Sequence, residues 1–339
     1  MPRYALLILP AFNRVYGESS VRLTRSELAV FSERGLGGKV RDSEETVIGG
    51  VPYVTFEAAT PLEQSDISLL SNLSAVYAVF GMEGDLLRPL TMRPLDRLSS
   101  DLITIQKYAG KTNEHFTKLL LNVTALAGEK GLGERLAVFD PLCGRGTTLN
   151  QALMYGYDAY GLDVDGKDFE AYAGFIKTWL RNKRLKHTAE TVPVRRDRAL
   201  LGRRLNVTFG LSKEAVKAGD VQHLAVVSAD TLKSREFFRP RSFDVVVADA
   251  PYGVQHGSKG GSGLSRSPLE LLRQAVPVWA ELLRPGGAMG IAWNTYGGKS
   301  ADLAEILRAA GLEVLDYPGF EHRVDQAIVR DIIVARRPR

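Results

Sequence analysis

Residues 139–165 read FDPLCGRGTTLNQALMYGYDAYGLDVD, and this stretch decides the fold. Its first part predicts a strand over 136–139 that ends at Asp140, followed by a glycine-rich turn and a helix. Its last part predicts a second strand over 159–162 that ends at Asp163. Asp163 follows Asp140 at a spacing of roughly 20 residues, which suits an acid that hydrogen-bonds a ribose hydroxyl. The stretch therefore predicts a βαβ unit with a nucleotide-like cofactor at its carboxyl edge; an ordinary βαβ unit is the alternative.

The turn between Asp140 and the helix carries the residues suited to a close ligand. Gly144 and Gly146 let a ligand approach the backbone, and Thr147 and Thr148 are candidate caps of the helix. Leu149 stands where a nicotinamide-binding motif would have its third glycine, so that cofactor is not indicated.

A second motif, VVVADAPYG, occupies residues 245–253. It predicts a buried strand that delivers Asp249, Ala250, Pro251 and Tyr252 to its carboxyl end. Ligands of open α/β sheets bind at this edge, near the topological switch point. The two motifs together therefore predict a cofactor site beside a substrate site, whereas DAPY alone would be a strand-end turn with a buried tyrosine.

DPLCGRGTT and GLDVD, with DAPYG downstream, resemble the motifs of S-adenosylmethionine-dependent amino-methyltransferases of nucleic acids. The most similar group is the tRNA guanosine 2-amino methyltransferases, and the resemblance covers roughly residues 104–336. It implies an α/β fold with a seven-stranded Rossmann-like methyltransferase sheet and S-adenosyl-L-methionine as cofactor. It also implies catalysis by Asp249, Ala250, Pro251 and Tyr252, although the family has a proline where Ala250 stands. The implied cofactor-binding residues are Thr112, Asn113, Asp140, Gly144, Gly146, Thr147, Asp163 and Asp230.

The departure at Ala250 is compatible with methyl transfer to an exocyclic amine. Such an amine is a poor nucleophile, and two acceptors aimed at its hydrogens would turn its lone pair toward the methyl donor. Asp249 supplies one acceptor and the carbonyl of Ala250 the other, so the second acceptor needs no particular side chain. Tyr252 can stack on the base.

The helix expected after Thr112 and Asn113 has apolar positions at helical spacing, and either residue can cap it. In the resembled family the start of this helix closes over the methionine end of the cofactor, so Lys111 is a further candidate contact. A capped helix that only packs against the core is the alternative.

Positive charge gathers between residues 181 and 204. Its basic residues are Arg181, Lys183, Arg184, Lys186, Arg195, Arg196, Arg198, Arg203 and Arg204. The segment interrupts the path from the second strand to the third, which predicts a surface extension or hairpin. A basic surface beside a base-modifying site suits a phosphate backbone, and we expect Arg195, Arg196 and Arg198 to bind the substrate. A solvated charged insertion is the alternative.

Further strands are expected over 224–227, before Asp230, over 288–292, 312–317 and 327–335, the last two antiparallel. Helices are expected over 268–283 and 301–310, and the Gly/Ser-rich run 256–267 predicts a substrate loop or lid. The first 95 residues predict a small α+β substrate-binding domain, ferredoxin-like in one interpretation, before a methyltransferase domain over 101–339. Strands over 4–9 and 53–56 and helices over 22–31 and 61–73 are its expected elements.

The 339 residues carry 45% hydrophobic and 24% charged residues and a net charge of +5, typical of a globular protein. No apolar run reaches the roughly 18 residues of a membrane span, and the single Cys143 excludes an internal disulfide. We therefore expect a cytoplasmic protein that uses no metal and no membrane and acts on tRNA in RNA processing. A DNA adenine 6-amino methyltransferase and a methyltransferase of a small-molecule amine remain alternatives, and the oligomeric state stays open.

Overall fold

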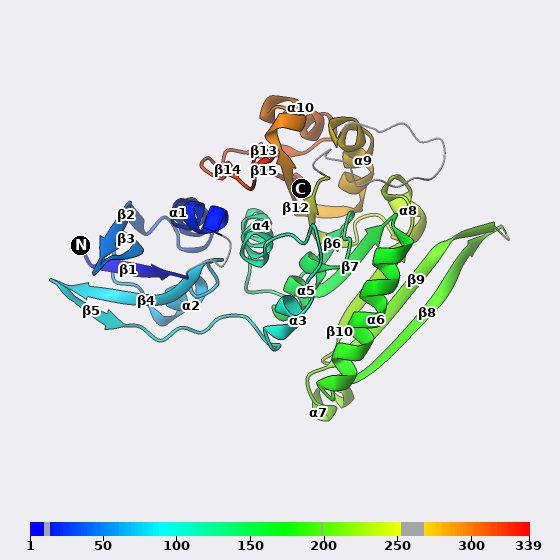
Figure 1. The fold of residues 1–339 in the computed structure, drawn as a ribbon, viewed down its shortest axis with the longest axis horizontal. Coiled ribbons are helices and arrows are strands. Elements are labelled where there is room, and N and C mark those ends of the chain that lie inside the picture. Colours follow the sequence, from blue (N-terminus) through cyan, green and yellow to red (C-terminus); the bar gives the residue numbers. More distant parts are fainter. Residues whose placement is uncertain (10–13, 198, 252–267) are drawn as a thin grey trace.

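The computed structural model describes residues 1–9, 14–197, 199–251 and 268–339. These residues form two β-sheets that lie side by side, a smaller one near the amino terminus and a larger one that takes up the rest of the chain (Figure 1).

The larger sheet has a parallel middle and antiparallel flanks. In spatial order its strands are β13 (Glu313–Leu315), β15 (Val329–Arg336), β12 (Leu283–Asn294), β11 (Phe243–Asp249), β6 (Ala137–Asp140), β7 (Asp158–Asp163), β10 (Gln222–Ser228), β9 (Ala199–Gly210) and β8 (Lys186–Arg196), and β14 (His322–Arg323) pairs with β15. The strands from β12 to β10 are parallel, whereas β15 and β9 run antiparallel to their neighbours. The chain order reverses at β6, so β6 is the topological switch point.

The expected strand order is present, but the expectation of seven strands is wrong. Within the described residues the sheet has ten strands, because β8 and β9 extend it beyond β10 and β14 adds to β15. The extension forms because Leu205, Val207 and Phe209 alternate along β9 and are buried. The basic segment thus contributes to a hairpin, one of the two predicted forms, but both strands of that hairpin belong to the sheet.

Helices cover both faces of this sheet. On one face lie α4 (Glu114–Ala127), α5 (Thr147–Met154) and α6 (Gly166–Asn182), and on the other α8 (Ser234–Phe237), α9 (Pro268–Leu282) and α10 (Ser300–Ala309); the short α3 (Asp101–Thr104), α7 (Lys213–Lys217), η1 (Thr231–Lys233) and η2 (Thr295–Gly297) lie in connections. Neighbouring strand residues join opposite cores: Val138 and Val247 face α4 and α5, whereas Phe139 and Val246 face α9. The apolar runs therefore become strands buried on both sides.

The smaller sheet is antiparallel, with the order β2 (Val40–Ile48), β3 (Val51–Ala58), β1 (Arg3–Ile8), β4 (Val76–Glu83) and β5 (Leu86–Pro89). Its helices are α1 (Arg14–Gly35) and α2 (Gln64–Leu70). The chain order β1-α1-β2-β3-α2-β4 is that of a ferredoxin-like unit, to which β5 adds an edge strand. The domain limits 1–95 and 101–339, and a substrate-binding role for the first, stay predictions.

A buried polar network joins this unit to the larger sheet. The Glu27 carboxylate on α1 accepts hydrogen bonds from Ser74 N at 2.9 Å, Ser74 Oγ at 2.6 Å and Asn122 Nδ2 at 2.8 Å. Asn122 on α4 also donates to Asn72 O and accepts from the Tyr155 hydroxyl. Glu27 and Asn122 have no exposed surface. Since α4 also covers the larger sheet, one helix packs against both parts of the molecule.

Candidate active site

The glycine turn after β6 takes a conformation that its sequence requires. Gly144 and Gly146 have φ values of +47° and +80°, in the left-handed region. A Cβ atom on Gly146 would lie 2.4 Å from the Tyr172 ring, so a side chain there would displace α6. Gly146 itself is the amino-terminal cap of α5, and the expectation that Thr147 or Thr148 caps this helix is wrong. The Thr148 side chain instead hydrogen-bonds Asp140.

Asp140 and Asp163 hold the two ends of this turn. Asp140 is buried, and its Oδ1 accepts a hydrogen bond from Leu142 N at 3.0 Å. Asp163 Oδ2 accepts from Gly144 N and its Oδ1 from Asp165 N, both at 2.8 Å. The backbone of the glycine turn is thus fixed onto the acid that ends the next strand.

The site concentrates negative charge. Burial raises the pKa of Asp140 to about 7, and the nearby carboxylates Asp163 and Asp249 add to the increase. Burial also raises the pKa of Asp163, against the lowering effect of its two backbone hydrogen bonds. A cationic ligand would relieve this repulsion. Burial raises the pKa of the Cys143 thiol well above its usual value, so Cys143 acts in packing.

Asp230 lies beyond the end of β10, on the side of β7 away from β6. It is exposed, and its Oδ1 accepts from Leu232 N at 3.0 Å as the cap of η1. The sequence interpretation missed Val164, which follows Asp163 and is 75% exposed. An apolar side chain that is exposed at the carboxyl edge of the sheet, directly after an acid, is suited to packing against the face of a planar ring. In the sequence, the signal for this residue was its position directly after the acid that ends the strand.

Asp249 ends β11, the neighbour of β6 on its other side, and Ala250 follows it. Ala250 is buried, and its N–H donates to Ala292 O at 2.8 Å, so the backbone leaves the sheet only after this residue. Pro251 is exposed. Tyr252 and the expected loop 256–267 lie outside the described residues.

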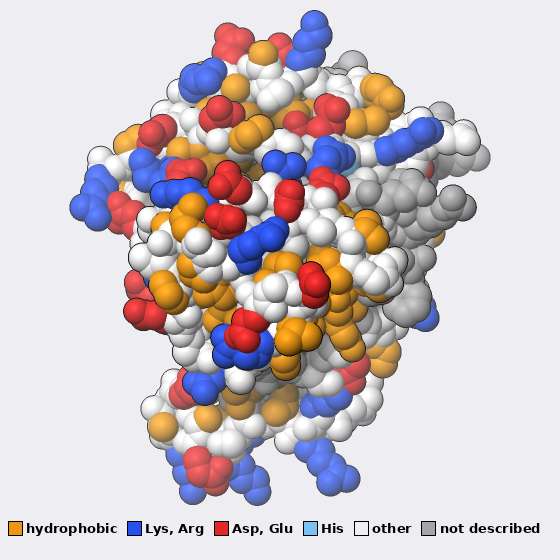
Figure 2. Space-filling view, turned by 90° about the vertical axis from the view of Figure 1, so that its left-hand side faces the viewer, with side chains coloured by type: hydrophobic (Ala, Val, Ile, Leu, Met, Phe, Trp, Pro, Cys, Tyr) orange, Lys and Arg blue, Asp and Glu red, His pale blue; other side chains and the backbone are white. Residues whose placement is uncertain are grey.

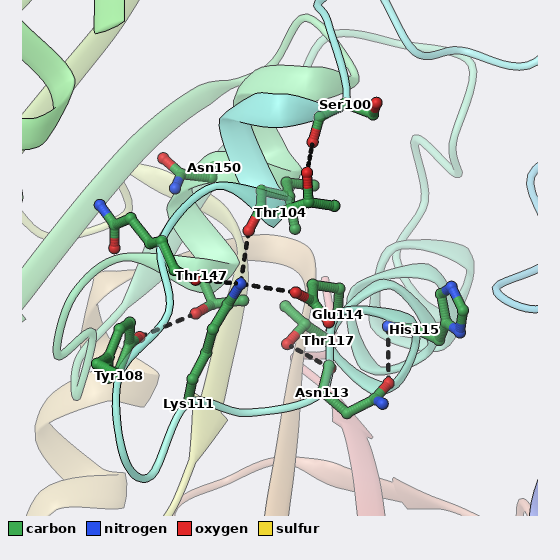
Figure 3. Close-up of polar contacts among 12 residues, drawn as sticks. Ser100, Thr104, Tyr108, Lys111, Asn113, Glu114, His115, Thr117, Thr147 and Asn150 are labelled. Atoms are coloured by element: carbon green, nitrogen blue, oxygen red, sulfur yellow. Dashed lines mark hydrogen bonds and ion pairs between the residues drawn. The ribbon is translucent and has the colours of Figure 1, made fainter. Parts of the chain in front are cut away.

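The three residues before α4 each make a different structural contact (Figure 3). Asn113 caps α4, because its Oδ1 accepts from His115 N at 2.9 Å and from Phe116 N at 3.2 Å. Lys111 donates to Ile103 O at 2.6 Å and Gln106 O at 2.9 Å and pairs with Glu114, which fastens the connection between α3 and α4. The Thr112 hydroxyl donates to Asp249 Oδ2 at 2.7 Å. The segment expected at the cofactor therefore reaches Asp249 of the second motif, a contact that helical periodicity did not reveal.

Tyr108 and Arg145, both missed in the sequence, lie beside the glycine turn. The Arg145 guanidinium lies 4.7 Å from the centre of the Tyr108 ring, and its Nε donates to Asp168 Oδ1 at 2.8 Å. The Tyr108 hydroxyl lies 3.3 Å from Thr147 Oγ1 (Figure 3). Thr147 thus lies at the start of α5 beside the Tyr108 hydroxyl, a placement compatible with its predicted role.

The basic hairpin lies on the far flank of the same sheet. Arg195 and Arg196 are exposed near its tip, and Arg198 lies outside the described residues. The two strands project away from the rest of the molecule (Figure 1). The opposite end of the molecule, where the small sheet lies, carries Lys and Arg mixed with Asp, Glu and apolar side chains (Figure 2).

No protein-family model matches the chain, and no curated protein matches it. The solved structures to which it is similar include the PH0226 protein from Pyrococcus horikoshii, with 13% identity, a TM-score of 0.39, and 72% of this chain and 97% of that chain covered. The N-methyltransferase NodS from Bradyrhizobium japonicum has 13% identity and a TM-score of 0.39, with 66% and 95% covered. The 1,6-didemethyltoxoflavin-N1-methyltransferase from Burkholderia thailandensis, solved with S-adenosylhomocysteine, has 15% identity and a TM-score of 0.38, with 69% and 94% covered.

Two features are absent from the described residues. None of their helices is long and apolar enough to cross a membrane. Within the same residues, no group of three or more His, Cys, Asp or Glu side chains is arranged to hold a metal ion.

Proposed function

We propose that this chain is a methyltransferase that moves a methyl group from S-adenosyl-L-methionine to an exocyclic amine of a nucleobase. One observation carries the proposal. Asp163, Asp140 and Asp249 end the three adjacent parallel strands β7, β6 and β11, on either side of the switch point. An electrostatically negative cofactor site therefore adjoins the motif that would receive the substrate.

The residues present fit this cofactor by their chemistry. When bound, the cofactor supplies a methyl group already activated by the positive sulfonium. Asp140 lies where an added positive charge would favour its ionised form, since burial and two carboxylates raise its pKa. Asp163 would accept from the ribose hydroxyls, Val164 would cover the adenine face, and Asp230 would accept from the adenine amine. Gly144 and Gly146 would admit the methionine end.

Asp249 and the backbone of Ala250 would act on the acceptor. The Asp249 carboxylate and the Ala250 carbonyl would accept hydrogen bonds from the amine, so that the nitrogen lone pair turns toward the methyl donor. Preorganised acceptors of this kind need no reorientation during the reaction. The predicted role of Tyr252 is to stack on the base.

We propose the 2-amino group of guanosine in tRNA as the acceptor. Support comes from the motif resemblance and from the hairpin, whose exposed Arg195 and Arg196 suit a phosphate backbone. The hairpin continues the sheet that carries the site, so RNA bound along it would remain in reach of the carboxyl edge.

Transfer of tritium from labelled cofactor to total tRNA and to genomic DNA, followed by nucleoside analysis, tests the proposal. We expect label in 2-methylguanosine from tRNA. Label in 6-methyladenine from DNA would assign the DNA alternative, and label in neither nucleic acid would refute the nucleobase acceptor and leave a small-molecule amine.

A further inference from the structure

Arg330 is a buried cation on β15. Only 4% of its side chain is exposed, and its guanidinium lies 4.2 Å from the centre of the Phe116 ring on α4. A guanidinium removed from water needs an anion or other compensating contacts nearby, because its desolvation is costly. A buried arginine in the core of the sheet therefore points to a specific role.

The sheet register explains how Arg330 comes to face Asp249. Asp249 pairs with Ala292 on β12, and Ala292 pairs with Ile332 on β15. Side chains alternate along a strand, so Arg330 lies on the same face as Ile332, and Asp249 on the same face as Ala292. β12 lies between β11 and β15, and the small side chain of Ala292 on β12 leaves room for the long Arg330 side chain to extend toward the carboxylate.

A hydrogen-bond donor and a cation from different elements lie next to one oxygen of Asp249. Arg330 Nη2 lies 3.9 Å from Asp249 Oδ2, and Thr112 Oγ1 donates to the same Oδ2 at 2.7 Å. Thr112 comes from the connection before α4, and Arg330 comes from the antiparallel strand β15. A carboxylate whose Oδ2 is held from both elements is restricted in rotation about its side-chain bonds.

We propose that Arg330 is a positioning residue. With Thr112, it holds the Asp249 carboxylate in the orientation in which the carboxylate accepts a hydrogen bond from the substrate amine. The inference rests on the proposed function and names a residue of that site outside its two motifs. A catalytic group can be displaced by only about 0.5 Å before its geometry becomes unproductive. Loss of Arg330 therefore slows methyl transfer, because the Asp249 carboxylate shifts, while the cofactor site stays intact.

The other charged and titratable groups near this contact do not replace Arg330. His322 on β14 lies with its ring centre 5.2 Å from that of Phe116, and burial lowers its pKa to about 4, so it is neutral at pH 7. Asp140, on the strand next to β11, is a carboxyl group, so any charge that it carries has the same sign as that of Asp249. Among the ion pairs of the described residues, Arg330 is the cation that lies within 4 Å of the Asp249 carboxylate.

The test compares Arg330→Met, Arg330→Lys and Thr112→Val with wild type in kcat, in KM for tRNA and in cofactor Kd. We expect a 10- to 100-fold lower kcat for Arg330→Met, partial recovery in Arg330→Lys, and a roughly 5-fold loss for Thr112→Val. For the two Arg330 variants, cofactor Kd should change less than 2-fold. Arg336→Met on the same strand is the matched control, because Arg336 pairs with Glu313 at the sheet margin, and it should keep wild-type kcat.

A double-mutant cycle separates positioning from a general effect on folding. In an Asp249→Asn background, Arg330→Met should lower kcat less than 2-fold further, because the group through which it acts is already lost. Equal losses in both backgrounds, or an Arg330→Met variant with more than half of wild-type kcat, would overturn the inference. A wild-type protein that methylates no amine would instead refute the proposed function. The same cycle is then measured on Tm, where coupled effects support the contact and additive effects overturn it.

Discussion

We expect Asp140 to make cofactor binding depend on pH. Its pKa of about 7 means that the free protein carries a proton there at and below neutral pH, mainly because the group is buried. A cationic cofactor favours the ionised carboxylate, so binding releases this proton. We expect the cofactor Kd to rise as pH falls below 7, by up to tenfold per unit. Calorimetry between pH 6 and 8 in two buffers measures both the Kd and the proton release.

Asp140→Asn is the control for that prediction. It should bind more weakly at pH 8 and lose both the pH dependence and the proton release. The stability contribution of this group changes with pH in the opposite direction to that of an acid held in a salt bridge. Because the folded pKa is raised, the cofactor-free protein is stabilised by this group below its unfolded pKa of about 4 and loses that stabilisation as pH rises toward 7. A Kd that is constant from pH 6 to 8 would contradict the placement of the cofactor charge beside Asp140.

Substitution of Asp249 should lower the rate of methyl transfer and leave the cofactor affinity nearly unchanged. Asp249→Asn keeps the side-chain size but replaces a carboxylate acceptor by an amide. We expect a loss of about a hundredfold or more in kcat, the range for removal of one preorganised polar group. Cofactor affinity, measured by calorimetry, should stay within about threefold of wild type. Retention of half of the activity would exclude the role assigned to the tetrapeptide 249–252.

At the scale of elements, the basic hairpin of β8 and β9 has a measurable electrostatic signature. Each phosphate contact releases counterions, so tRNA affinity should fall steeply with salt. We expect Arg195→Ser combined with Arg196→Ser to reduce the slope of log K against log salt by up to about two units. Arg308→Ser with Arg336→Ser, at the opposite edge of the sheet, is the control and should leave the slope unchanged. Equal slopes for all three proteins would remove the hairpin from the RNA interface.

The elements that the sequence predicted well are those with a strong apolar signal. β6, β7 and β11 follow their predicted ranges to within two residues, because each is a short apolar run with an acid at its end. β2 and β5 were missed, since edge strands are largely exposed and carry little periodicity. The predicted helix over 22–31 is the inner part of the longer α1.

The predicted site residues differ in how far local sequence could place them. Asp140, Asp163 and Asp249 lie on adjacent strands because parallel strands bring their carboxyl ends to one edge, a rule that a sequence supports directly. The Thr112 contact with Asp249 and the burial of Arg330 depend on how α4 and β15 pack on the sheet. Those contacts join residues more than 80 positions apart, and no local pattern encodes them.

At the scale of the whole molecule, the Glu27 network holds the ferredoxin-like unit against α4 and therefore near the site. Glu27→Ala would leave the donors of Ser74 and Asn122 buried without their acceptor. An unsatisfied buried group costs about 1–3 kcal/mol, so we expect the free energy of unfolding to fall on the order of 3 kcal/mol. Urea unfolding followed by circular dichroism measures this change.

Glu33→Ala on the same helix is the matched control, because Glu33 is exposed and pairs with its neighbour Arg34. It should change the unfolding free energy by less than about 0.5 kcal/mol. Burial raises the pKa of Glu27, so its ionisation opposes folding, and the stability of wild type relative to Glu27→Gln should fall as pH rises above the ordinary glutamate value. If Glu27→Ala were as stable as the control, the two units would be held together by apolar packing alone. Hydrogen exchange that rises in α4 of Glu27→Ala, and not in Glu33→Ala, would show that the polar network keeps this helix ordered, and with it the segment that places Thr112 on Asp249.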